Sequence, residues 1–281
     1  MSELTSLDRL LPHFDGFLVD QFGVLLTAEG AYPGAQESLE RLSAYGKRVI
    51  LLSNSGKRSE PNIDRLLMLG FKRESFLTVL SSGEVAFAIL RRRIGVDLPA
   101  RPTALLLARD HDRSAIAGLD IVLTTDAGAA DMVLIAGSES DRIEFDAIVE
   151  GLRPAAMRGV PALCSNPDLV MLTAIGPRPG AGALAKAYER MGGSVDYIGK
   201  PYPAIYAEAS RLLSPIEPKR ILCIGDSPAH DIAGGRTAGF ATALVRTGIH
   251  AAISDDALAA LAQAEGAVPD FIIPRFQLAA A

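Results

Sequence analysis

Short, continuously apolar runs alternate with longer amphipathic segments along most of the chain, and this alternation limits the possible folds more than any other feature. Residues 16–20 (GFLVD), 48–53 (RVILLS) and 220–225 (RILCIG) are runs of the first kind. A strand whose side chains are all apolar is buried on both faces, which is typical of a parallel sheet covered by helices. Residues 34–45 and 59–69 instead repeat apolar side chains at helical spacing and are each followed by a glycine. The sequence therefore predicts an α/β fold.

The same alternation fills the middle of the chain and predicts a second α/β unit there. Further strands are expected at residues 103–108, 121–124, 131–136, 160–165, 195–198, 240–245 and 270–273. Further helices are expected at residues 84–94, 141–152, 181–191, 204–213 and 229–238. The glycine- and proline-rich segment 176–182 (GPRPGAG) is a candidate junction between the units.

Composition and charge exclude several classes of protein. The 281 residues include 28 Lys and Arg against 33 Asp and Glu, and the resulting net charge of −5 argues against a nucleic-acid or anionic-membrane surface. Apolar residues make up 49% of the chain, but no apolar run approaches the roughly 18 residues of a membrane span. The first residues lack the basic start of a signal peptide, and the two cysteines form no disulfide framework. We therefore expect a cytoplasmic protein with neither nucleic acid nor membrane as its partner.

Three aspartates follow two of the predicted strands. Asp20 ends the strand at 16–20, and Asp226 and Asp231 follow the strand at 220–225. The carboxyl ends of parallel strands line the crevice where such sheets bind ligands. Clustered acids repel one another unless a cation or a proton lies among them, and oxygen ligands favour Mg²⁺. The alternative is structural: Asp20 and Asp226 would cap turns or helices, and Asp231 would lie on a solvated face.

Two further segments carry groups suited to an anion. Ser53, at the end of the strand at 48–53, begins the polar turn Ser53-Asn54-Ser55-Gly56, whose hydroxyl and backbone N–H groups can surround an oxyanion. Lys200 follows the short strand at 195–198 and precedes a helix, where its ammonium group can act as a point charge for phosphate. Each segment taken alone is an ordinary polar turn or surface lysine.

Taken together and in this order, Asp20, Ser53, Lys200 and the segment from Asp226 to Asp231 resemble the four motifs of the haloacid dehalogenase superfamily. The interval between the second and third motifs is 200 − 53 = 147 residues, enough for a complete α/β cap. The chain is most similar to the class IIA branch, which includes 4-nitrophenylphosphatase- and pyridoxal-phosphatase-like proteins. The segments that carry this resemblance are Ser53-Asn54-Ser55, Asn166-Pro167-Asp168, Pro179-Gly180-Ala181-Gly182 and Gly199-Lys200-Pro201.

The resemblance implies an architecture and a class of substrate. The architecture is a Rossmann-like, doubly wound parallel sheet with an inserted α/β cap domain. We assign residues 1–80 and 186–281 to the two parts of the core and residues 81–185 to the cap. The substrate would be a small phosphorylated metabolite, and caps of this type suggest a homodimer.

The resemblance also implies a reaction. Asp20 would attack phosphorus and form an aspartyl-phosphate. Mg²⁺ would be held by Asp20, the backbone carbonyl of Phe22 and Asp226, with Asp231 coordinating the ion or orienting a bound water. The chain would be a phosphatase, and therefore a hydrolase.

Other residues would bind the substrate. Ser53 and Lys200 would hold the phosphoryl oxygens and offset charge in the transition state, with Asn54 beside them. The cap segment that carries Asn166 and Asp168 would exclude water and select the leaving group.

Phe22 departs from the pattern of the phosphatases in this superfamily. These enzymes usually carry a second aspartate two positions after the nucleophile, which protonates the leaving group, and Phe22 cannot do so. General acid–base catalysis contributes roughly 10²–10⁴-fold, so we expect a slow or selective phosphatase. One alternative is a catalytically weak relative that binds a phosphorylated ligand. Another is a metal-independent dehalogenase, which is disfavoured because Asp226 and Asp231 are retained.

Overall fold

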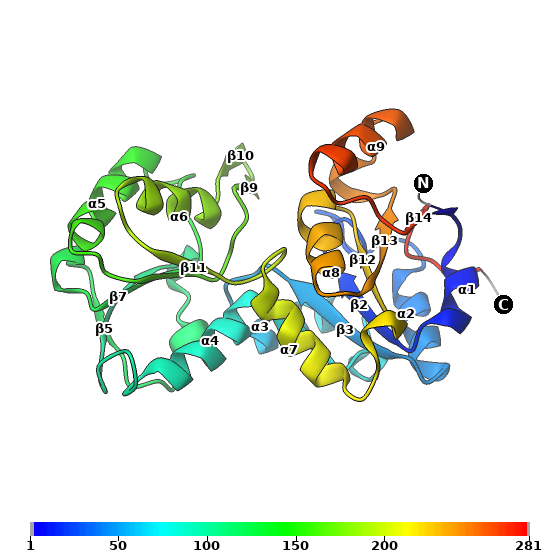
Figure 1. Ribbon diagram of the computed structural model, residues 1–281, viewed down its shortest axis with the longest axis horizontal. Helices are drawn as coiled ribbons and strands as arrows, with labels where there is room; N and C mark the ends of the chain where they lie inside the picture. Colours follow the sequence, from blue (N-terminus) through cyan, green and yellow to red (C-terminus); the bar gives the residue numbers. More distant parts are fainter. Residues whose placement is uncertain (1–2, 280–281) are drawn as a thin grey trace. The chain divides into compact units, whose positions relative to one another are not determined.

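The computed structural model describes residues 3–279 and divides the chain into two compact units (Figure 1). The first unit comprises the residues up to Ser53, Glu60–Leu80 and the residues from Lys200 onward. The second comprises Asn54–Ser59 and Ser81–Gly199. The first unit is therefore built from separate stretches of the chain, and most of the second unit is inserted between them.

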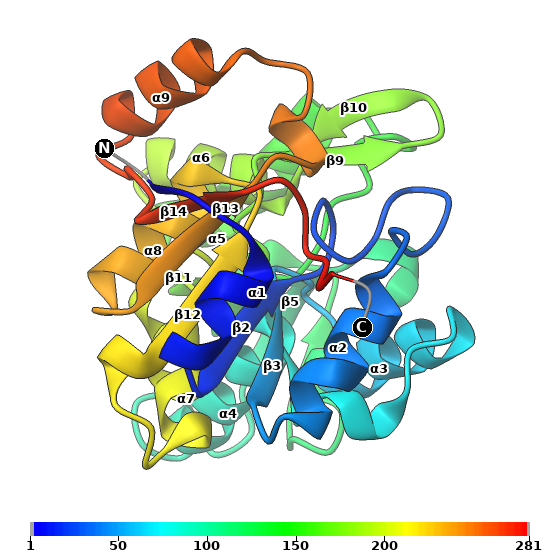
Figure 2. The ribbon, with the colours of Figure 1, turned by 90° about the vertical axis from the view of Figure 1, so that its right-hand side faces the viewer.

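The first unit contains a sheet with the strand order β1-β14-β13-β12-β2-β3-β4. Pairing is parallel between β1 and β14, β14 and β13, β13 and β12, β12 and β2, and β2 and β3. Figure 2 shows β12, β2 and β3 side by side in this order. The strands are β1 (Glu3–Leu4), β2 (Gly16–Asp20), β3 (Arg48–Ser53), β4 (Thr78–Ser81), β12 (Ile221–Gly225), β13 (Ala241–Val245) and β14 (Phe271–Ile273).

Helices cover both faces of this sheet. Alternate strand residues, such as Phe17 and Val19 of β2, are buried in one cluster with Leu39 of α2 and Leu66 of α3. On the other face, Gly235 of α8 lies so close to Cys223 of β12 that an added Cβ would be 2.9 Å from the cysteine Cβ. The sheet is therefore doubly wound, as predicted. The helices are α1 (Leu7–Leu10), α2 (Ala35–Ala44), α3 (Ser59–Met68), α7 (Pro203–Leu213), α8 (Ala233–Thr237) and α9 (Asp255–Ala264).

The second unit has its own parallel sheet with the order β11-β8-β7-β5-β6. The helices α5 and α6 lie side by side next to this sheet (Figure 1) and pack through Leu152, Leu184 and Tyr188 onto β7 and β8. The helices of this unit are α4 (Ser82–Arg93), α5 (Phe145–Met157) and α6 (Ala181–Arg190). Its sheet strands are β5 (Thr103–Leu107), β6 (Val122–Thr124), β7 (Met132–Ile135), β8 (Ala162–Cys164) and β11 (Val195–Tyr197).

The structure corrects two expectations about the second unit. The return to the first unit, predicted at residue 186, occurs after Gly199, because α6 packs on the second sheet and β11 pairs with β8. The segment 176–182 is not a junction either. It contributes β10 (Gly176–Pro179), which pairs with β9 (Val170–Thr173) in an antiparallel hairpin, and the start of α6.

Both cysteines are buried and free. Within residues 3–279, no helix is long and apolar enough to cross a membrane.

Candidate active site

The structure brings the three strand-end aspartates together in the first unit. β2 and β12 are neighbouring parallel strands with Val19 opposite Ile224, so Asp20 and Asp226 leave the sheet at the same edge. Asp231 lies in the π-helical turn Pro228–Ile232 that follows β12. One carboxylate oxygen from each aspartate lies within 4.8 Å of the others. The capping and solvated-face alternatives therefore do not describe this group.

Glycines provide the space that these carboxylates occupy. A Cβ atom at Gly225, the last residue of β12, would lie 2.0 Å from Cγ of Asp231. Gly23 has a φ of +82°, a left-handed conformation that glycine adopts without steric cost, and a Cβ there would lie 2.0 Å from Oδ2 of Asp226. Any larger residue at either position would displace a carboxylate.

Lys200 connects two of the aspartates. Its Nζ atom lies 2.6 Å from Oδ1 of Asp20 and 2.7 Å from Oδ1 of Asp231. The side chain is 4% exposed, so both contacts are shielded from water. Ser53 is buried one residue beyond Leu52, which is paired with Asp20 across β2 and β3. Lys200 and Ser53 thus lie beside the aspartates. Together, these residues form the aspartate site: Asp20, Ser53, Lys200, Asp226 and Asp231.

The electrostatics of this group reflect an excess of negative charge. Burial raises the pKa of Asp20 to about 8, although the Lys200 ammonium acts in the opposite direction. Burial and the charge of Asp231 raise the pKa of Asp226 to about 6. Burial alone would lower the pKa of Lys200, but the charges of Asp20 and Asp231 outweigh it and the pKa is raised. Ionising all three carboxylates beside one ammonium group is therefore costly.

Phe22 presents an aromatic ring beside the site. Its side chain is 52% exposed, and the guanidinium carbon of Arg65 lies 4.9 Å from the ring centroid, a cation–π contact. Arg65 also donates through Nη2 to Oε1 of the buried Gln21, at 2.6 Å. The position two residues after Asp20, where the resemblance led us to expect an acid, is therefore occupied by an aromatic ring that contacts a cation.

Backbone groups that the sequence did not suggest also hold the aspartates. The N–H of Ile249 donates to Oδ2 of Asp226 at 2.8 Å, and the N–H of Ser227 donates to Oδ2 of Asp231 at 3.3 Å. The hydroxyl of Thr247 donates to the carbonyl oxygen of Gly23 at 2.6 Å. Thr247 and Ile249 follow β13, so the same strand-end rule that identified Asp20 could have identified this loop.

The remaining predicted site residues lie in the second unit. Nδ2 of Asn54 donates to Oδ1 of Asp168 at 2.7 Å, and the N–H of Asp168 donates to Oδ1 of Asn166 at 3.2 Å. Gly199 packs closely against this group, because a Cβ there would lie 2.8 Å from Oδ1 of Asn54. Ser53 and Asn54, adjacent in the sequence, thus belong to different units.

Comparisons with known proteins identify the family of this chain. Residues 17–122 match the family model described as haloacid dehalogenase-like hydrolase, and residues 197–278 match a second model described as HAD-hydrolase-like. Chronophin from Homo sapiens is 30% identical over 256 residues, which span 87% of this chain and 85% of chronophin. The chain belongs to the haloacid dehalogenase-like hydrolases. The predicted family, its class IIA branch and the hydrolase class are therefore confirmed.

Two further relatives of this haloacid dehalogenase-like hydrolase carry phosphatase names. Glycerol-3-phosphate phosphatase from Rattus norvegicus is 30% identical over 266 residues, which span 85% of this chain and 81% of the relative. The structure of p-nitrophenyl phosphatase from Archaeoglobus fulgidus superimposes with a TM-score of 0.74 at 25% identity, covering 94% of this chain and 97% of that one.

Proposed function

We propose that this protein is a Mg²⁺-dependent phosphohydrolase that acts on a small phosphomonoester through an aspartyl-phosphate at Asp20. The observation that carries the proposal is the charge of the site. Three carboxylates surround one ammonium group, so full ionisation leaves 3 − 1 = 2 negative charges uncompensated in a buried position. A divalent cation would neutralise both charges.

The donor set fits Mg²⁺. Asp20, Asp226 and Asp231 offer only hard carboxylate oxygens, grouped within 4.8 Å. The backbone carbonyl of Phe22 is the fourth candidate ligand, and its aromatic side chain does not prevent this role. Bound there, the ion would supply positive charge to the phosphoryl oxygens during transfer.

The roles of the side chains follow from their positions. A carboxylate oxygen of Asp20 attacks phosphorus, the bond from phosphorus to the leaving oxygen breaks, and water then hydrolyses the aspartyl-phosphate to release phosphate and restore Asp20. Lys200, 2.6 Å from Asp20, keeps that carboxylate oriented and offsets charge on the phosphoryl oxygens. Ser53 contributes its hydroxyl to the same oxygens.

Phe22 determines which substrates react well. Without an acid at this position, the leaving oxygen departs as an anion or takes its proton from water, which favours substrates whose leaving group is a weak base. The names of the two phosphatase relatives suggest a small substrate. Asn54, Asn166 and Asp168 are the candidates for contacts with its leaving group.

Replacement of Asp20 tests the proposal. Asp20→Asn should reduce turnover of 4-nitrophenyl phosphate by at least 10³-fold, because an amide oxygen is a poor nucleophile. Asp64→Asn, an exposed aspartate on α3 of the same unit, is the matched control and should retain activity. Activity that survives in Asp20→Asn, or that is indifferent to EDTA in the wild type, would contradict the mechanism.

A second candidate function rests on Phe22 itself. A chain without the acid could bind a phosphorylated ligand in the same site with little turnover. This reading predicts metal-dependent binding of phosphomonoesters, measured by calorimetry, with no phosphate release across a broad substrate panel. Turnover of any phosphomonoester in that panel that is lost in Asp20→Asn would exclude it.

A further inference from the structure

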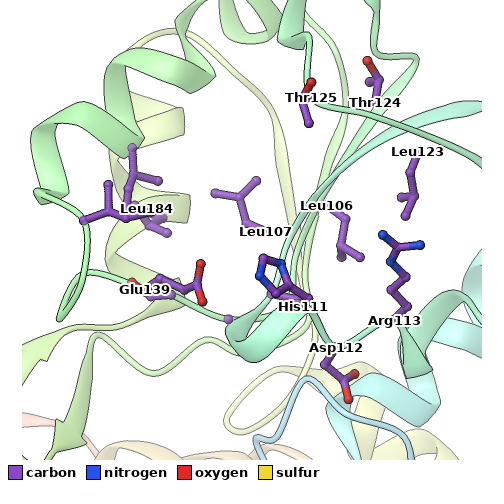
Figure 3. Close-up of a pocket in the computed structure, with 15 residues that line it drawn as sticks. Leu106, Leu107, His111, Asp112, Arg113, Leu123, Thr124, Thr125, Glu139 and Leu184 are labelled. Atoms are coloured by element: carbon purple, nitrogen blue, oxygen red, sulfur yellow. The ribbon is translucent and has the colours of Figure 1, made fainter.

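A cavity of about 620 Å³ lies within the second unit, at the carboxyl ends of β5, β6 and β7 (Figure 3). All of the residues that line it belong to this unit. None of Asp20, Ser53, Lys200, Asp226 and Asp231 is among them. The cavity is therefore formed by the second unit alone.

The topology of the second sheet accounts for the cavity. β5 lies between β6 and β7. The chain leaves β5 toward β6 on one side, whereas it leaves β7 through α5 toward β8 on the other. Loops that diverge from neighbouring parallel strands leave a crevice between them, and such crevices are where open α/β sheets bind ligands.

Among the described residues, the acidic side chains that line the cavity have partners, whereas those of His111 and Arg113 do not. Oδ1 of Asp112 accepts from the N–H and the hydroxyl of Ser114 at 3.0 and 2.6 Å, and Oε1 of Glu139 lies 3.1 Å from Nη1 of Arg142. Among residues 3–279, the side chains of His111 and Arg113 make no hydrogen bond or ion pair. In the view of Figure 3, His111 lies between Glu139 and Arg113.

The loop that presents His111 is held in an unusual conformation. Asp110 and His111 have φ angles of 54° and 55°, in the left-handed region. Ion pairs fix the loop: Arg109 contacts both carboxylate oxygens of Asp141 at 2.9 and 2.7 Å, and Nη1 of Arg142 lies 2.7 Å from Asp110. Such conformations persist only where surrounding contacts stabilise them, and they are frequent at ligand sites.

Apolar residues also line the cavity, beside the polar ones. Leucine and isoleucine residues of strands, helices and loops line the cavity: Leu106, Leu107, Leu123, Ile143 and Ile148. The volume is in the range of small-molecule sites, and the mixed lining suits a small molecule that carries both an apolar body and a polar group.

We propose that the second unit holds a separate binding site for a small organic anion, one with an apolar body and a carboxylate, sulfonate or phosphate group. Arg113 and His111 bind the anionic group, and the leucine and isoleucine side chains pack against the body. The site does not depend on the proposed phosphatase activity.

Fluorescence titration with anilinonaphthalene sulfonate, an apolar anion that brightens when it leaves water, tests the charged part of the site. The wild type should bind it saturably, and Arg113→Gln should weaken binding at least fivefold. Arg92→Gln, an exposed arginine of α4 outside the cavity, makes the same change in charge and should bind as the wild type does. Equal affinity in the two variants, or no saturable binding, would overturn the proposal.

The apolar part has its own test. Ile143 lines the cavity and is 47% exposed, so Ile143→Asn should fold normally and weaken binding of the same probe. Val96, 83% exposed and outside the cavity, gives the matched control Val96→Asn.

Asp20→Asn should bind the probe with unchanged affinity. A change of affinity in Asp20→Asn, in either direction, would place the probe in the aspartate site and overturn the proposal, whatever the outcome for phosphatase activity.

Discussion

Replacing Phe22 with aspartate would restore an acid to the site, and Arg65 would influence the pKa of that acid. An aspartate at position 22 would be two residues after Asp20, where the family's phosphatases usually have their acid. It would also come within reach of the Arg65 guanidinium, which now lies 4.9 Å from the Phe22 ring centroid. A nearby cation favours the ionised carboxylate and so opposes its use as an acid.

Phe22→Asp should therefore raise turnover of alkyl phosphates more than that of 4-nitrophenyl phosphate, whose leaving group needs no proton. The gain should be several-fold, and larger when Arg65→Gln is added, because the new carboxyl group can then keep its proton. Steady-state kcat for both substrates measures the effect, and Arg65→Gln alone is the control. An equal response of the two substrates would show that protonation of the leaving group does not limit the wild type.

A methyl group added at Gly225 tests whether Asp231 helps to hold Mg²⁺. A Cβ there would lie 2.0 Å from Cγ of Asp231, so Gly225→Ala should displace Asp231 and disturb its contact with Lys200. We expect Mg²⁺ affinity, measured by calorimetry, to fall at least tenfold. Gly151→Ala is the control, because Gly151 lies in α5 with no atom near its added Cβ. Equal Mg²⁺ affinity in the two variants would mean that Asp231 does not help to hold the ion.

At the scale of elements, the start of α4 is fixed by a network around Glu84. The N-cap residue Ser81 accepts from the N–H of Glu84 at 3.1 Å. The Glu84 carboxylate in turn accepts from the guanidinium of Arg58 at 3.0 and 2.7 Å and from the N–H of Ser59 at 3.1 Å. This carboxylate therefore fastens residues 54–59 to the second unit.

Glu84→Gln should lower the free energy of unfolding at pH 7 by about 1.5–3 kcal/mol, the range for hydrogen bonds to a charged group. Burial raises the pKa of Glu84, but the bonds from Arg58 and Ser59 outweigh it and hold that pKa below 4.5. The unfolded chain therefore binds the proton more tightly, so the stabilisation is complete above pH 4.5 and is lost as the pH falls below it.

Urea unfolding at several pH values measures this difference. Glu150→Gln removes a similar pair with Arg153, but that pair is exposed on one helix, and we expect no measurable change. A Glu84→Gln difference that stays constant down to pH 3 would show that the carboxylate charge is not its source.

The elements that the sequence predicts well are those whose pattern is local. The strands at 16–20 and 48–53 match β2 and β3 because a continuous apolar run marks both ends of a buried strand. The β9–β10 hairpin was missed because Pro177 and Pro179 suggest a break, whereas an edge strand tolerates proline. The contact of Asn54 with Asp168 spans 114 residues, and no local pattern encodes it.

The two candidate sites also differ in whether a local sequence pattern predicts them. Asp20 and Asp226 could be grouped from the sequence because Asp20 ends one strand and Asp226 follows another strand of one parallel sheet, and the sheet brings such positions to one edge. Arg113 and His111 follow no such rule. Their availability depends on which neighbours already hold Asp112 and Glu139, and that appears only once the side chains are packed.

At the scale of the whole molecule, the aspartate site and the cavity belong to different units. The carboxylates and Lys200 come from distant parts of the chain, yet all lie in the first unit. The cavity lies wholly in the second unit. A ligand of one site should therefore stabilise its own unit first, because binding to the native arrangement opposes local opening there.

Hydrogen exchange with and without Mg²⁺ measures this separation. If Mg²⁺ binds as proposed, it should slow exchange in peptides that contain Asp20 and in those that span Asp226 and Asp231, because such binding requires these carboxylates to be in place. Peptides from β7 and α6, in the interior of the second unit, should exchange at the same rate in both conditions. Asp226→Asn removes one of the proposed ligands and should abolish the protection in the first unit. Equal slowing in both units would instead show that the ion stabilises the molecule as one cooperative body, and the carboxylate site and the cavity could then influence each other.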